Sequence, residues 1–381
     1  MLRRYSSRMR RRIRKKQGSR SSGAKSKPKY EVFVEGEGNS ITTQIDTSPP
    51  QQRRPAAAAA AAAVNGSGSH RRSNMAPCVG VDRRNIQSFL DTFDCVLFDC
   101  DDVIWNQNKP VPGAAEAIRK LRCLGKQVLF VTNNNFLSGD QILRKFQSQG
   151  HQVSKEEIFS AGYATAIYLK DVLKLQGKVY LIGSDGLEAE LQACGVPCIG
   201  VGPDPYLGEE AEHKWLEEEL DGDVKAVVVG YDKHFSYVKV FKAASYLSIS
   251  DVAFVGTNTD ESVPIPEKGK TKPGTGVFVR AIEIASCRSA TTIGKPSRYL
   301  LDCIKEKYDI NPERTLMVGD RHNTDVLFGK RCGMKTMAVF TGVLSKAELT
   351  RYRESPEPEE QEYVPDFFLD SVGDLSSLID L

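Results

Sequence analysis

The sequence has no apolar run near the roughly 18 residues that a membrane-spanning helix needs, and its nine cysteines follow no regular spacing. There is no C-x-x-C pair, and Cys194 and Cys198 lack a second pair of ligands, so neither a disulfide framework nor a zinc site is indicated. Reduced thiols in an intracellular protein fit this usage. The net charge is only +3, and nearly all of the positive excess lies before Lys29. We therefore expect a soluble protein that contacts no membrane and has no general affinity for nucleic acid.

Residues 1–75 contain few large apolar side chains, which leaves little surface to bury. We predict a disordered, basic, low-complexity tail here. Its start, MLRRYSSRMRRRIRKK, contains no acid and resembles a mitochondrial presequence. The RRRIRKK cluster is equally compatible with a nuclear signal or a patch for an anionic surface such as nucleic acid, and a solvated tail without an address is a third interpretation. The sequence does not choose among these, and a cytoplasmic location is the default expectation.

From Asn85 onward, short apolar runs rich in Val, Leu and Phe alternate with stretches of helical periodicity. The runs are CVLFD, KQVLFVT, KVYLIG, VKAVVVG, DVAFVG, RTLMVGD and KTMAVF, and helices are expected over 114–124 and 299–308. Continuous apolar strands that alternate with helices indicate a doubly wound parallel α/β sheet covered on both faces. Such sheets bind ligands beyond the carboxyl ends of their strands, so polar residues at those ends are the candidates for a site.

Polar residues follow three of these runs and one further short apolar stretch. They are Asp99-Cys100-Asp101-Asp102 after 96–98, Thr132-Asn133-Asn134 after 128–131, Gly294-Lys295-Pro296-Ser297 after 291–293, and Gly319-Asp320 after 316–318, with Asp325 five positions later. Carboxylates gathered at one edge repel each other without a cation, and hard oxygen ligands suit Mg²⁺. A carboxylate can also act as a covalent nucleophile. Phosphoryl transfer needs positive charge and donors around the phosphoryl oxygens, which Lys295 and the Thr132 hydroxyl can supply. Each element alone is common, but the ordered set predicts a phosphoryl-transfer site.

Together, DCDDVIW, VTNNN, IGKPS and VGDRHNTDVLFG resemble the four motifs of the haloacid dehalogenase superfamily, and the resemblance runs from about Ile86 to the C-terminus. Longer stretches are similar to its phosphoglycolate phosphatase and pyridoxal phosphatase branch, which includes 4-nitrophenylphosphatase-like enzymes. These stretches are NKPVPGAAEAIRKLR, AVVVGYDKHFSYVK, NPERTLMVGDR and VPDFFLDSVGDL. The resemblance implies a Rossmann-like core and a Mg²⁺-dependent phosphatase. Its substrates would be small phosphorylated metabolites such as 2-phosphoglycolate or pyridoxal 5′-phosphate, hydrolysed through an aspartyl-phosphate intermediate.

The resemblance also implies a role for each matching position. Asp99 is expected to attack phosphorus, and Asp101 to protonate the leaving oxygen and later to activate water. Mg²⁺ is expected on the Asp99 carboxylate, the Asp101 backbone carbonyl and Asp320. Lys295 is expected to neutralise charge on the nucleophile and the phosphate. The remaining implied residues are Thr132, Asn133 and Asn134 for phosphate binding, and Asp325, which orients Lys295 or a metal-bound water.

A long insert separates Thr132 from Lys295 and contains its own predicted strands and helices, so it should form a second α/β domain. The resembling enzymes carry an inserted cap of the C2 type at this place. We predict the core over 76–177, the cap over 178–289, and the core again over 290–381. A cap excludes water from the phosphate pocket and admits only small leaving groups.

The loop 230–236 follows a buried run of the insert and precedes a predicted helix. The resemblance implies that His234 in this loop contacts the leaving group of the substrate. A helix-capping loop with an exposed histidine is the alternative interpretation. The same resemblance implies a homodimer formed through the cap.

Three features depart from the family pattern. Motif one normally has glycine where this chain has Asp102, which adds a carboxylate beside an anionic substrate. Motif two continues as Asn135-Phe136-Leu137, without the usual hydroxyl and lysine, and His322-Asn323 replaces the commoner Leu-Asp in motif four. No principal catalytic residue is lost, but a catalytically weakened paralogue that acts as a binding or scaffold protein remains open. A phosphoserine protein phosphatase fits poorly beneath a cap, and a nucleic-acid-associated protein would have to act through the basic tail.

Overall fold

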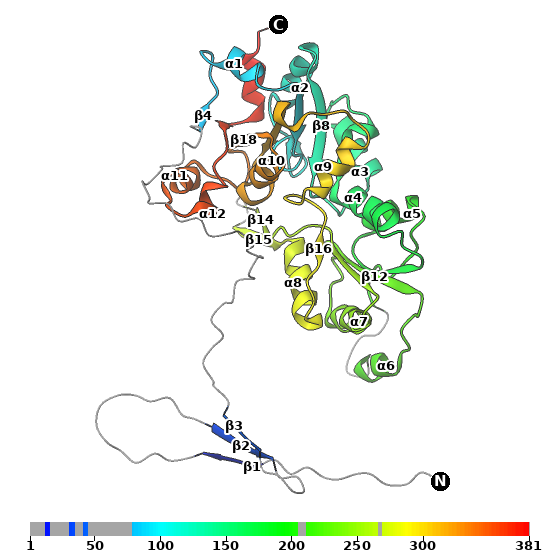
Figure 1. Cartoon of the computed structure of the whole chain (residues 1–381). Coiled ribbons are helices and arrows are strands. Elements are labelled where there is room, and N and C mark those ends of the chain that lie inside the picture. Colours follow the sequence, from blue (N-terminus) through cyan, green and yellow to red (C-terminus); the bar gives the residue numbers. More distant parts are fainter. Residues whose placement is uncertain are drawn as a thin grey trace, which may run out of the picture. The chain divides into compact units, whose positions relative to one another are not determined.

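The computed structural model describes residues 78–204, 211–265 and 269–380, together with three short strands nearer the N-terminus (Figure 1). The chain divides into two compact units, residues 1–73 and 74–381. In the first unit, β1 (Arg12–Lys15), β2 (Tyr30–Val34) and β3 (Ile41–Gln44) form an antiparallel sheet in that order. The rest of the predicted disordered tail lies outside the described residues, so its disorder and its address stay predictions.

The second unit contains a seven-stranded sheet in the order β4–β19–β18–β17–β5–β8–β9, in which every neighbouring pair is parallel. The strands are β4 (Val79–Gly80), β5 (Cys95–Phe98), β8 (Gln127–Thr132), β9 (Ile158–Ser160), β17 (Thr315–Gly319), β18 (Lys335–Val339) and β19 (Phe367–Leu369). Because β5 lies between β17 and β8, the residues that follow these three strands meet at one edge of the sheet.

Helices cover both faces of this sheet. Successive side chains of a strand point to opposite faces, and here both sets are apolar and need to be buried. Val96 and Phe98 pack with the helices of one face, whereas Cys95 and Leu97 pack with those of the other. The first face carries α1 (Ile86–Leu90), α2 (Ala114–Cys123), α3 (Gly139–Ser148) and α13 (Leu375–Leu378); the second carries α4 (Ala161–Ile167), α9 (Tyr299–Lys305) and α10 (Leu327–Arg331). Near the C-terminus lie α11 (Lys346–Glu354) and α12 (Pro358–Gln361). The prediction of a doubly wound parallel α/β fold is confirmed.

The insert forms a second parallel sheet with its own helices, in the order β11–β10–β12–β13–β16. Its strands are β10 (Lys178–Ile182), β11 (Cys198–Ile199), β12 (Val224–Val229), β13 (Ala253–Gly256) and β16 (Thr291–Thr292); its helices are α5 (Asp185–Ala193), α6 (Ala211–Glu217), α7 (Tyr237–Leu247) and α8 (Thr275–Ser286). The predicted inserted α/β region is therefore present. β16 begins just beyond the predicted boundary at residue 289, and the domain boundaries themselves stay predictions.

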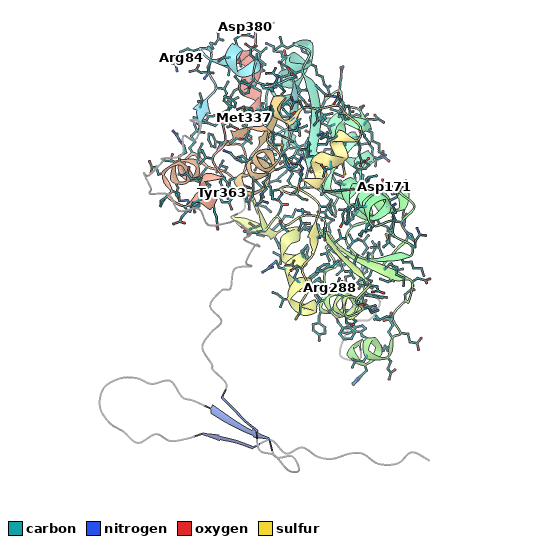
Figure 2. All side chains as sticks on the ribbon, viewed as in Figure 1. Arg84, Asp171, Arg288, Met337, Tyr363 and Asp380 are labelled. Carbon is teal, nitrogen blue, oxygen red and sulfur yellow. The ribbon has the colours of Figure 1, made fainter. Side chains whose placement is uncertain are left out.

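The two sheets share an apolar cluster. In β10, Val179 and Leu181 belong to the cluster that includes Leu97 of β5, whereas Tyr180 and Ile182 face α7 and α8. Side chains fill the space between the sheets and their helices (Figure 2). Burying each such side chain contributes about 1.5–3 kcal/mol, so the insert packs on the core through apolar side chains.

Two short hairpins complete the unit: β6 (Trp105–Asn106) with β7 (Lys109–Pro110), and β14 (Ser262–Ile265) with β15 (Lys270–Pro273). The first follows motif one directly in the sequence, and the second, β14–β15, lies within the insert (Figure 1). Among the described residues, no helix is both long and apolar enough to cross a lipid bilayer.

Candidate active site

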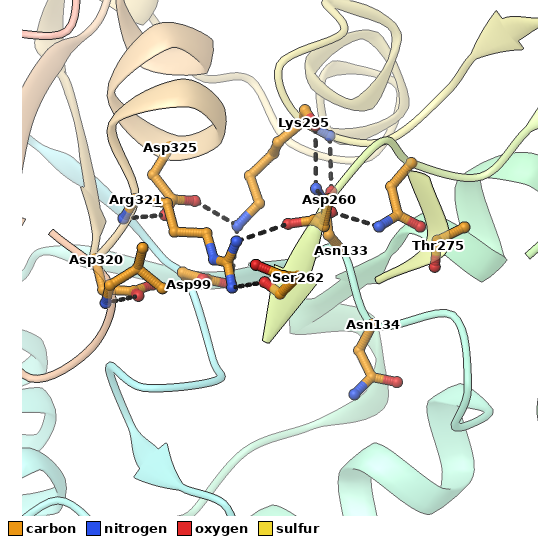
Figure 3. A network of polar contacts seen from close by, with 12 residues as sticks. Asp99, Asn133, Asn134, Asp260, Ser262, Thr275, Lys295, Asp320, Arg321 and Asp325 are labelled. Carbon is orange, nitrogen blue, oxygen red and sulfur yellow. Dashed lines mark hydrogen bonds and ion pairs between the residues drawn. The ribbon is translucent and has the colours of Figure 1, made fainter. Parts of the chain in front are cut away.

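The first carboxylate of the candidate site, Asp99, follows β5 directly and is buried. Its backbone N–H donates to the Val318 carbonyl of β17 at 2.9 Å, which continues the sheet by one residue. Its Oδ1 accepts the Cys100 N–H at 2.8 Å. These bonds fix the carboxylate at the end of β5. Since β17 runs parallel to β5, the carboxylate of Asp320, which follows β17, lies at the same edge (Figure 3).

Lys295 reaches this edge from the end of the insert, and only 1% of its side chain is exposed. Its Nζ lies 2.8 Å from Asp99 Oδ1 and 2.7 Å from Asp325 Oδ1 (Figure 3), and it donates to the Val131 carbonyl at 2.9 Å. Asn133 fixes the Lys295 backbone, because its Oδ1 accepts the Lys295 N–H at 2.8 Å and its Nδ2 donates to the Lys295 carbonyl at 3.0 Å. A lone buried ammonium is costly, so the two carboxylates are what keep Lys295 charged here.

The buried charges shift one another's pKa values. Burial raises the pKa of Asp99 well above its usual range; Lys295 opposes this, while Asp325 and Asp320 add to it. Burial, followed by the charge of Asp325, raises the pKa of Asp320 from 3.8 to about 8. Burial works against the charge of Lys295, but Asp325 and Asp99 outweigh it and raise its pKa. One lysine thus leaves the negative charge of the cluster incompletely balanced, which favours either protons or a further cation.

The cluster fits a divalent cation. Asp99, Asp320 and Asp325 each place a carboxylate oxygen within 4.8 Å of the other two, and all three residues are buried. Hard oxygens at this spacing suit Mg²⁺. The structure therefore brings together Asp99 and Asp320 of the predicted metal set and adds the Asp325 carboxylate. The predicted contribution of the Asp101 backbone carbonyl stays a prediction.

Two glycines let these carboxylates approach. A Cβ built on Gly319 would lie 2.2 Å from Asp325 Cβ, and one built on Gly342 would lie 2.1 Å from Asp320 Oδ2. Neither position has room for a side chain. Asp320 Oδ2 also accepts the Val343 N–H at 2.8 Å, so a backbone that comes this close can serve as a donor to the carboxylate.

Asp102, which stands where the family has glycine, adopts a left-handed backbone with φ of 61°. This conformation explains why glycine is usual at the position. The Asp102 carbonyl accepts the Thr341 hydroxyl at 2.5 Å. Its charge is among those that raise the pKa of Asp320. The departure noted in the sequence therefore has both a backbone and an electrostatic effect.

The Asp101 carboxylate belongs to a different set of contacts. Its Oδ1 accepts the Trp105 Nε1–H at 2.8 Å and lies 3.6 Å from Lys145 Nζ. Its Oδ2 accepts the Asn134 Nδ2–H at 3.2 Å. The side chain is 44% exposed, so the second motif-one carboxylate remains accessible to water.

The motif-two side chains hold the site together. Thr132 is buried at the end of β8, and its Oγ1 accepts the Asn134 N–H at 3.0 Å. Asn134 Oδ1 accepts the N–H groups of Phe136 and Leu137 at 3.1 and 3.0 Å. The structure thus places Thr132, Asn133 and Asn134 among the predicted catalytic residues, while their contacts with phosphate stay predictions.

His234 lies in the loop between β12 and α7 with an exposed side chain. Its N–H donates to Asp232 Oδ1 at 2.7 Å, and the other Asp232 oxygen pairs with Lys239 at 2.5 Å in the interior of the insert. Within the part of the chain that the structure describes, no contact joins the His234 side chain to the carboxylate cluster. Its role toward a leaving group stays a prediction.

Sequence reasoning missed several residues that connect the core to the insert. Asn135 is buried, donates to Asn258 Oδ1 at 2.7 Å and Thr275 Oγ1 at 3.1 Å, and accepts the Tyr231 N–H at 2.6 Å. The motif-two departure at this position therefore supplies an amide that binds the insert. No local signal marks Asn135, because its partners lie about a hundred residues or more away in the sequence.

Asp260 and Arg321 extend this connection (Figure 3). Asp260 Oδ2 accepts the Asn133 Nδ2–H at 2.8 Å. Arg321 Nη1 lies 3.9 Å from Asp260 Oδ1, and Nη2 donates to the Ser262 carbonyl of β14 at 2.9 Å. The only sequence signal for Arg321 is its place next to Asp320.

Comparisons with known proteins agree with this geometry. Residues 96–197 match the family described as haloacid dehalogenase-like hydrolase, and residues 292–375 match a second HAD-hydrolase-like family. Human glycerol-3-phosphate phosphatase is 44% identical over 79% of this chain and 95% of its own length. Human chronophin is 38% identical over 79% of this chain and 98% of its own.

Solved structures show the same architecture. The 4-nitrophenylphosphatase of Thermotoga maritima superposes with a TM-score of 0.62 at 26% identity, covering 76% of this chain and 98% of that one. NagD from E. coli superposes with a TM-score of 0.59 at 26% identity, covering 76% of this chain and 99% of that one. The chain therefore belongs to the haloacid dehalogenase-like hydrolases, as a phosphatase with a parallel α/β core and an inserted α/β cap.

Proposed function

We propose that the chain is a Mg²⁺-dependent phosphatase that hydrolyses small phosphomonoesters through an aspartyl-phosphate on Asp99. The observation that carries this proposal is the position of Lys295 Nζ, 2.8 Å from Asp99 and 2.7 Å from Asp325, in a cluster that also contains Asp320. A fixed ammonium beside a carboxylate nucleophile is positioned to neutralise charge as a phosphoryl group arrives.

The reaction would proceed in two steps. In the first, an Asp99 carboxylate oxygen attacks phosphorus, the ester P–O bond breaks, and the Asp101 carboxylic acid gives its proton to the leaving oxygen. In the second, the Asp101 carboxylate takes a proton from water, whose oxygen attacks phosphorus. The bond between Asp99 and phosphorus then breaks, which regenerates the Asp99 carboxylate and the Asp101 carboxylic acid and releases inorganic phosphate.

The chain's residues divide the remaining tasks. Lys295 would hold charge beside Asp99, and the Thr132 hydroxyl and the Asn133 and Asn134 amides would orient the phosphoryl group. Asp99 and Asp320, with Asp325 beside them, would hold the metal. When bound, Mg²⁺ would offset the carboxylate charges and polarise the phosphoryl oxygens.

For the substrate, we propose a small phosphorylated metabolite. Glycerol 3-phosphate leads, because the human glycerol-3-phosphate phosphatase shares 44% identity over nearly its whole length. Pyridoxal 5′-phosphate and 2-phosphoglycolate are the other members of the class we expect to fit. The inserted cap supports a small leaving group because a closed cap leaves little room for a macromolecule.

The test is phosphate release by the full chain from a panel of these esters and 4-nitrophenyl phosphate, with Mg²⁺ and with EDTA. We expect metal-dependent turnover, and its loss in Asp99→Asn, which keeps the shape of the side chain. Trapping of ³²P on the wild-type protein but not on Asp99→Asn would identify the intermediate. A folded protein that releases no phosphate from any ester would favour the weakened, ligand-binding paralogue instead.

We also propose a homodimer formed through the insert. The proposal is supported by large apolar side chains that α7 and α8 expose: Tyr237 is 69% exposed, Val277 46% and Ile284 74%. Apolar surface of this kind is typical of protein interfaces. Light scattering of the full chain should give twice the monomer mass, and Ile284→Glu should reduce it toward the monomer. A monomeric wild type would contradict the proposal. Contact of the basic tail with nucleic acid stays a prediction about residues outside those described.

A further inference from the structure

Lys145 and Trp105 lie beside the carboxylate that the proposed reaction uses as its acid. The indole Nε1–H of Trp105 donates to Asp101 Oδ1 at 2.8 Å, and Lys145 Nζ lies 3.6 Å from the same oxygen. Lys145 Nζ also lies 4.2 Å from the centroid of the Trp105 ring. The Lys145 ammonium therefore lies over the face of the indole, and the Asp101 carboxylate accepts a hydrogen bond from its edge.

The fold brings these groups together from two separate elements. Trp105 begins β6 and is buried, with its ring 4.6 Å from that of Phe146 in an edge-on arrangement. Phe146 lies on the buried face of α3, so the preceding residue, Lys145, lies beside the indole. α3 starts at a capping box in which the Ser138 hydroxyl accepts the Gln141 N–H and the Gln141 side chain accepts the Ser138 N–H. The register of α3 therefore fixes where the Lys145 ammonium lies.

We propose that Lys145 is a positioning residue for proton transfer by Asp101, acting together with Trp105. The inference rests on the function proposed above. When the ester P–O bond breaks, its electron pair stays on the leaving oxygen, and the proton of Asp101 moves to that oxygen. Asp101 is then left as an anion that faces the Lys145 ammonium and the indole N–H. The two groups stabilise this charge as it develops, and the indole also sets the direction of the carboxylate.

The proposal has a consequence that a structural role would not have. An alkoxide is a poor leaving group and needs the proton, whereas 4-nitrophenolate leaves without it. Removing the ammonium with Lys145→Gln should lower kcat/KM for glycerol 3-phosphate about tenfold, a fraction of what general acid catalysis supplies. The same change should alter kcat/KM for 4-nitrophenyl phosphate less than about twofold, because that constant reports the first, acid-independent step. A half-exposed ion pair adds little stability, so thermal unfolding should be unchanged.

Matched variants isolate the effect. Lys145→Arg keeps a cation and should recover most of the activity toward glycerol 3-phosphate. Trp105→Phe keeps an aromatic ring but removes the N–H, and should reproduce the same dependence on the leaving group. Lys155→Gln removes a lysine that pairs with Asp140 of α3 at 2.6 Å, and should change the turnover of neither substrate.

A double-variant cycle tests whether Lys145 acts through Asp101. In an Asp101→Asn background, Lys145→Gln should cause no further loss with glycerol 3-phosphate. Equal losses with both esters, or losses that multiply with Asp101→Asn, would overturn the inference. If the wild type turns over 4-nitrophenyl phosphate but Lys145→Gln affects both esters equally or not at all, the role of Lys145 is rejected and the proposed function stands. A wild type inactive toward every ester would reject the proposed function and this inference with it.

Discussion

Asp99 and Asp101, which are separated by a single residue, differ in their exposure to solvent, although each faces a lysine. Asp99 is 11% exposed and its partner Lys295 1%, with 2.8 Å between Oδ1 and Nζ. Asp101 is 44% exposed and its partner Lys145 18%, at 3.6 Å. Asp99 directly continues β5, whereas Asp101 lies two residues further along, where its carboxylate contacts Trp105 of β6 and Lys145 of α3.

This difference matches the role proposed for each carboxylate. Breaking a buried ion pair costs about 3–5 kcal/mol because a charge is left without a partner, whereas a half-exposed pair is worth about 0–1 kcal/mol. A nucleophile that must be fixed before the substrate arrives benefits from the first arrangement. A residue that exchanges protons with a leaving group and with water needs the second. Burial, rather than the residue type, separates the two roles.

The largest effect is expected from Lys295→Met, which removes the buried cation and leaves Asp99 and Asp325 facing each other. We expect kcat/KM to fall about 10³-fold or more, because the charge that stabilises the transferred phosphoryl group is lost. We also expect the free energy of unfolding to fall by about 3–5 kcal/mol, since two buried carboxylates lose their partner. Steady-state kinetics and urea unfolding measure the two quantities.

Lys239→Met is the matched control, because Lys239 is also buried and paired, with Asp232 of the insert. It should lose a similar amount of stability and far less activity. If Lys295→Met lost no more activity than Lys239→Met, the buried cluster would be a structural core and not a phosphoryl-transfer site.

The second expected effect is an unusual pH dependence of the metal-free protein. The pKa of Asp320 is raised to about 8 in the folded state from 3.8, so the folded state binds the proton more tightly than the unfolded chain. The stability gained from that proton is complete below about pH 4 and is lost as the pH rises toward 8. Mg²⁺ competes with the proton, so the stabilisation by added Mg²⁺ should grow over the same range.

Urea unfolding at several pH values, with EDTA and with Mg²⁺, measures this dependence. Asp320→Asn is the control, because it removes the titrating group while the other carboxylates continue to titrate. The difference in slope between wild type and Asp320→Asn is the expected signal. Identical slopes would mean that Asp320 does not carry the proton.

The third effect compares neighbouring residues of motif two. Asn135→Ala should lower the free energy of unfolding by about 1–3 kcal/mol, because it removes three hydrogen bonds between the buried amide and the insert. Asn134→Ala should cost less, about 1 kcal/mol, because its partner Asp101 is accessible to water and its other partners, the N–H groups of Phe136 and Leu137, are only part-buried. Urea unfolding of both variants gives the comparison. An equal cost would mean that Asn135 does not join the core to the insert.

Much of the buried side of the site could be predicted from the sequence, and little of the exposed side. Asp99 and Asp320 follow apolar runs that form neighbouring parallel strands, and such strands bring their carboxyl ends together. Lys295 follows a strand of the insert's sheet, so this rule does not place it, and its motif was the signal that predicted it. Lys145 and Trp105 have no such marker. Their meeting depends on the register of α3 and on the packing of Phe146 against the indole, which no local pattern specifies.

The fold shows the same limit. Apolar runs predicted the central strands of both sheets, because buried parallel strands are continuously hydrophobic. The short strands β4, β11 and β16 have only two residues each, too few for a pattern. β16 joins the sheet of the insert by pairing with β13. The predicted boundary at residue 289 therefore falls between β16 and the other strands of the insert's sheet.

The smallest effect is expected from Asp102→Gly, at the residue that directly follows Asp101. Glycine adopts a φ of 61° without strain, so the variant should gain at most about 1 kcal/mol of stability. Because the charge of Asp102 is among those that raise the pKa of Asp320, its removal should lower that pKa. The pH range over which the metal-free protein loses stability should then end at a lower pH. Urea unfolding across the pH series measures both changes.

Two controls separate the backbone effect of Asp102→Gly from the loss of charge. Asp102→Asn removes the charge but keeps a side chain that tolerates the left-handed region, so it should lower the pKa of Asp320 without the gain in stability. Gln107→Gly relieves a similar backbone, with φ of 55°, at an exposed position, and should leave the pH dependence unchanged. If Asp102→Asn left the pH dependence as it is in the wild type, the charge of Asp102 would not reach the buried cluster. Asp102 would then belong with Asp101 to the exposed side of the site.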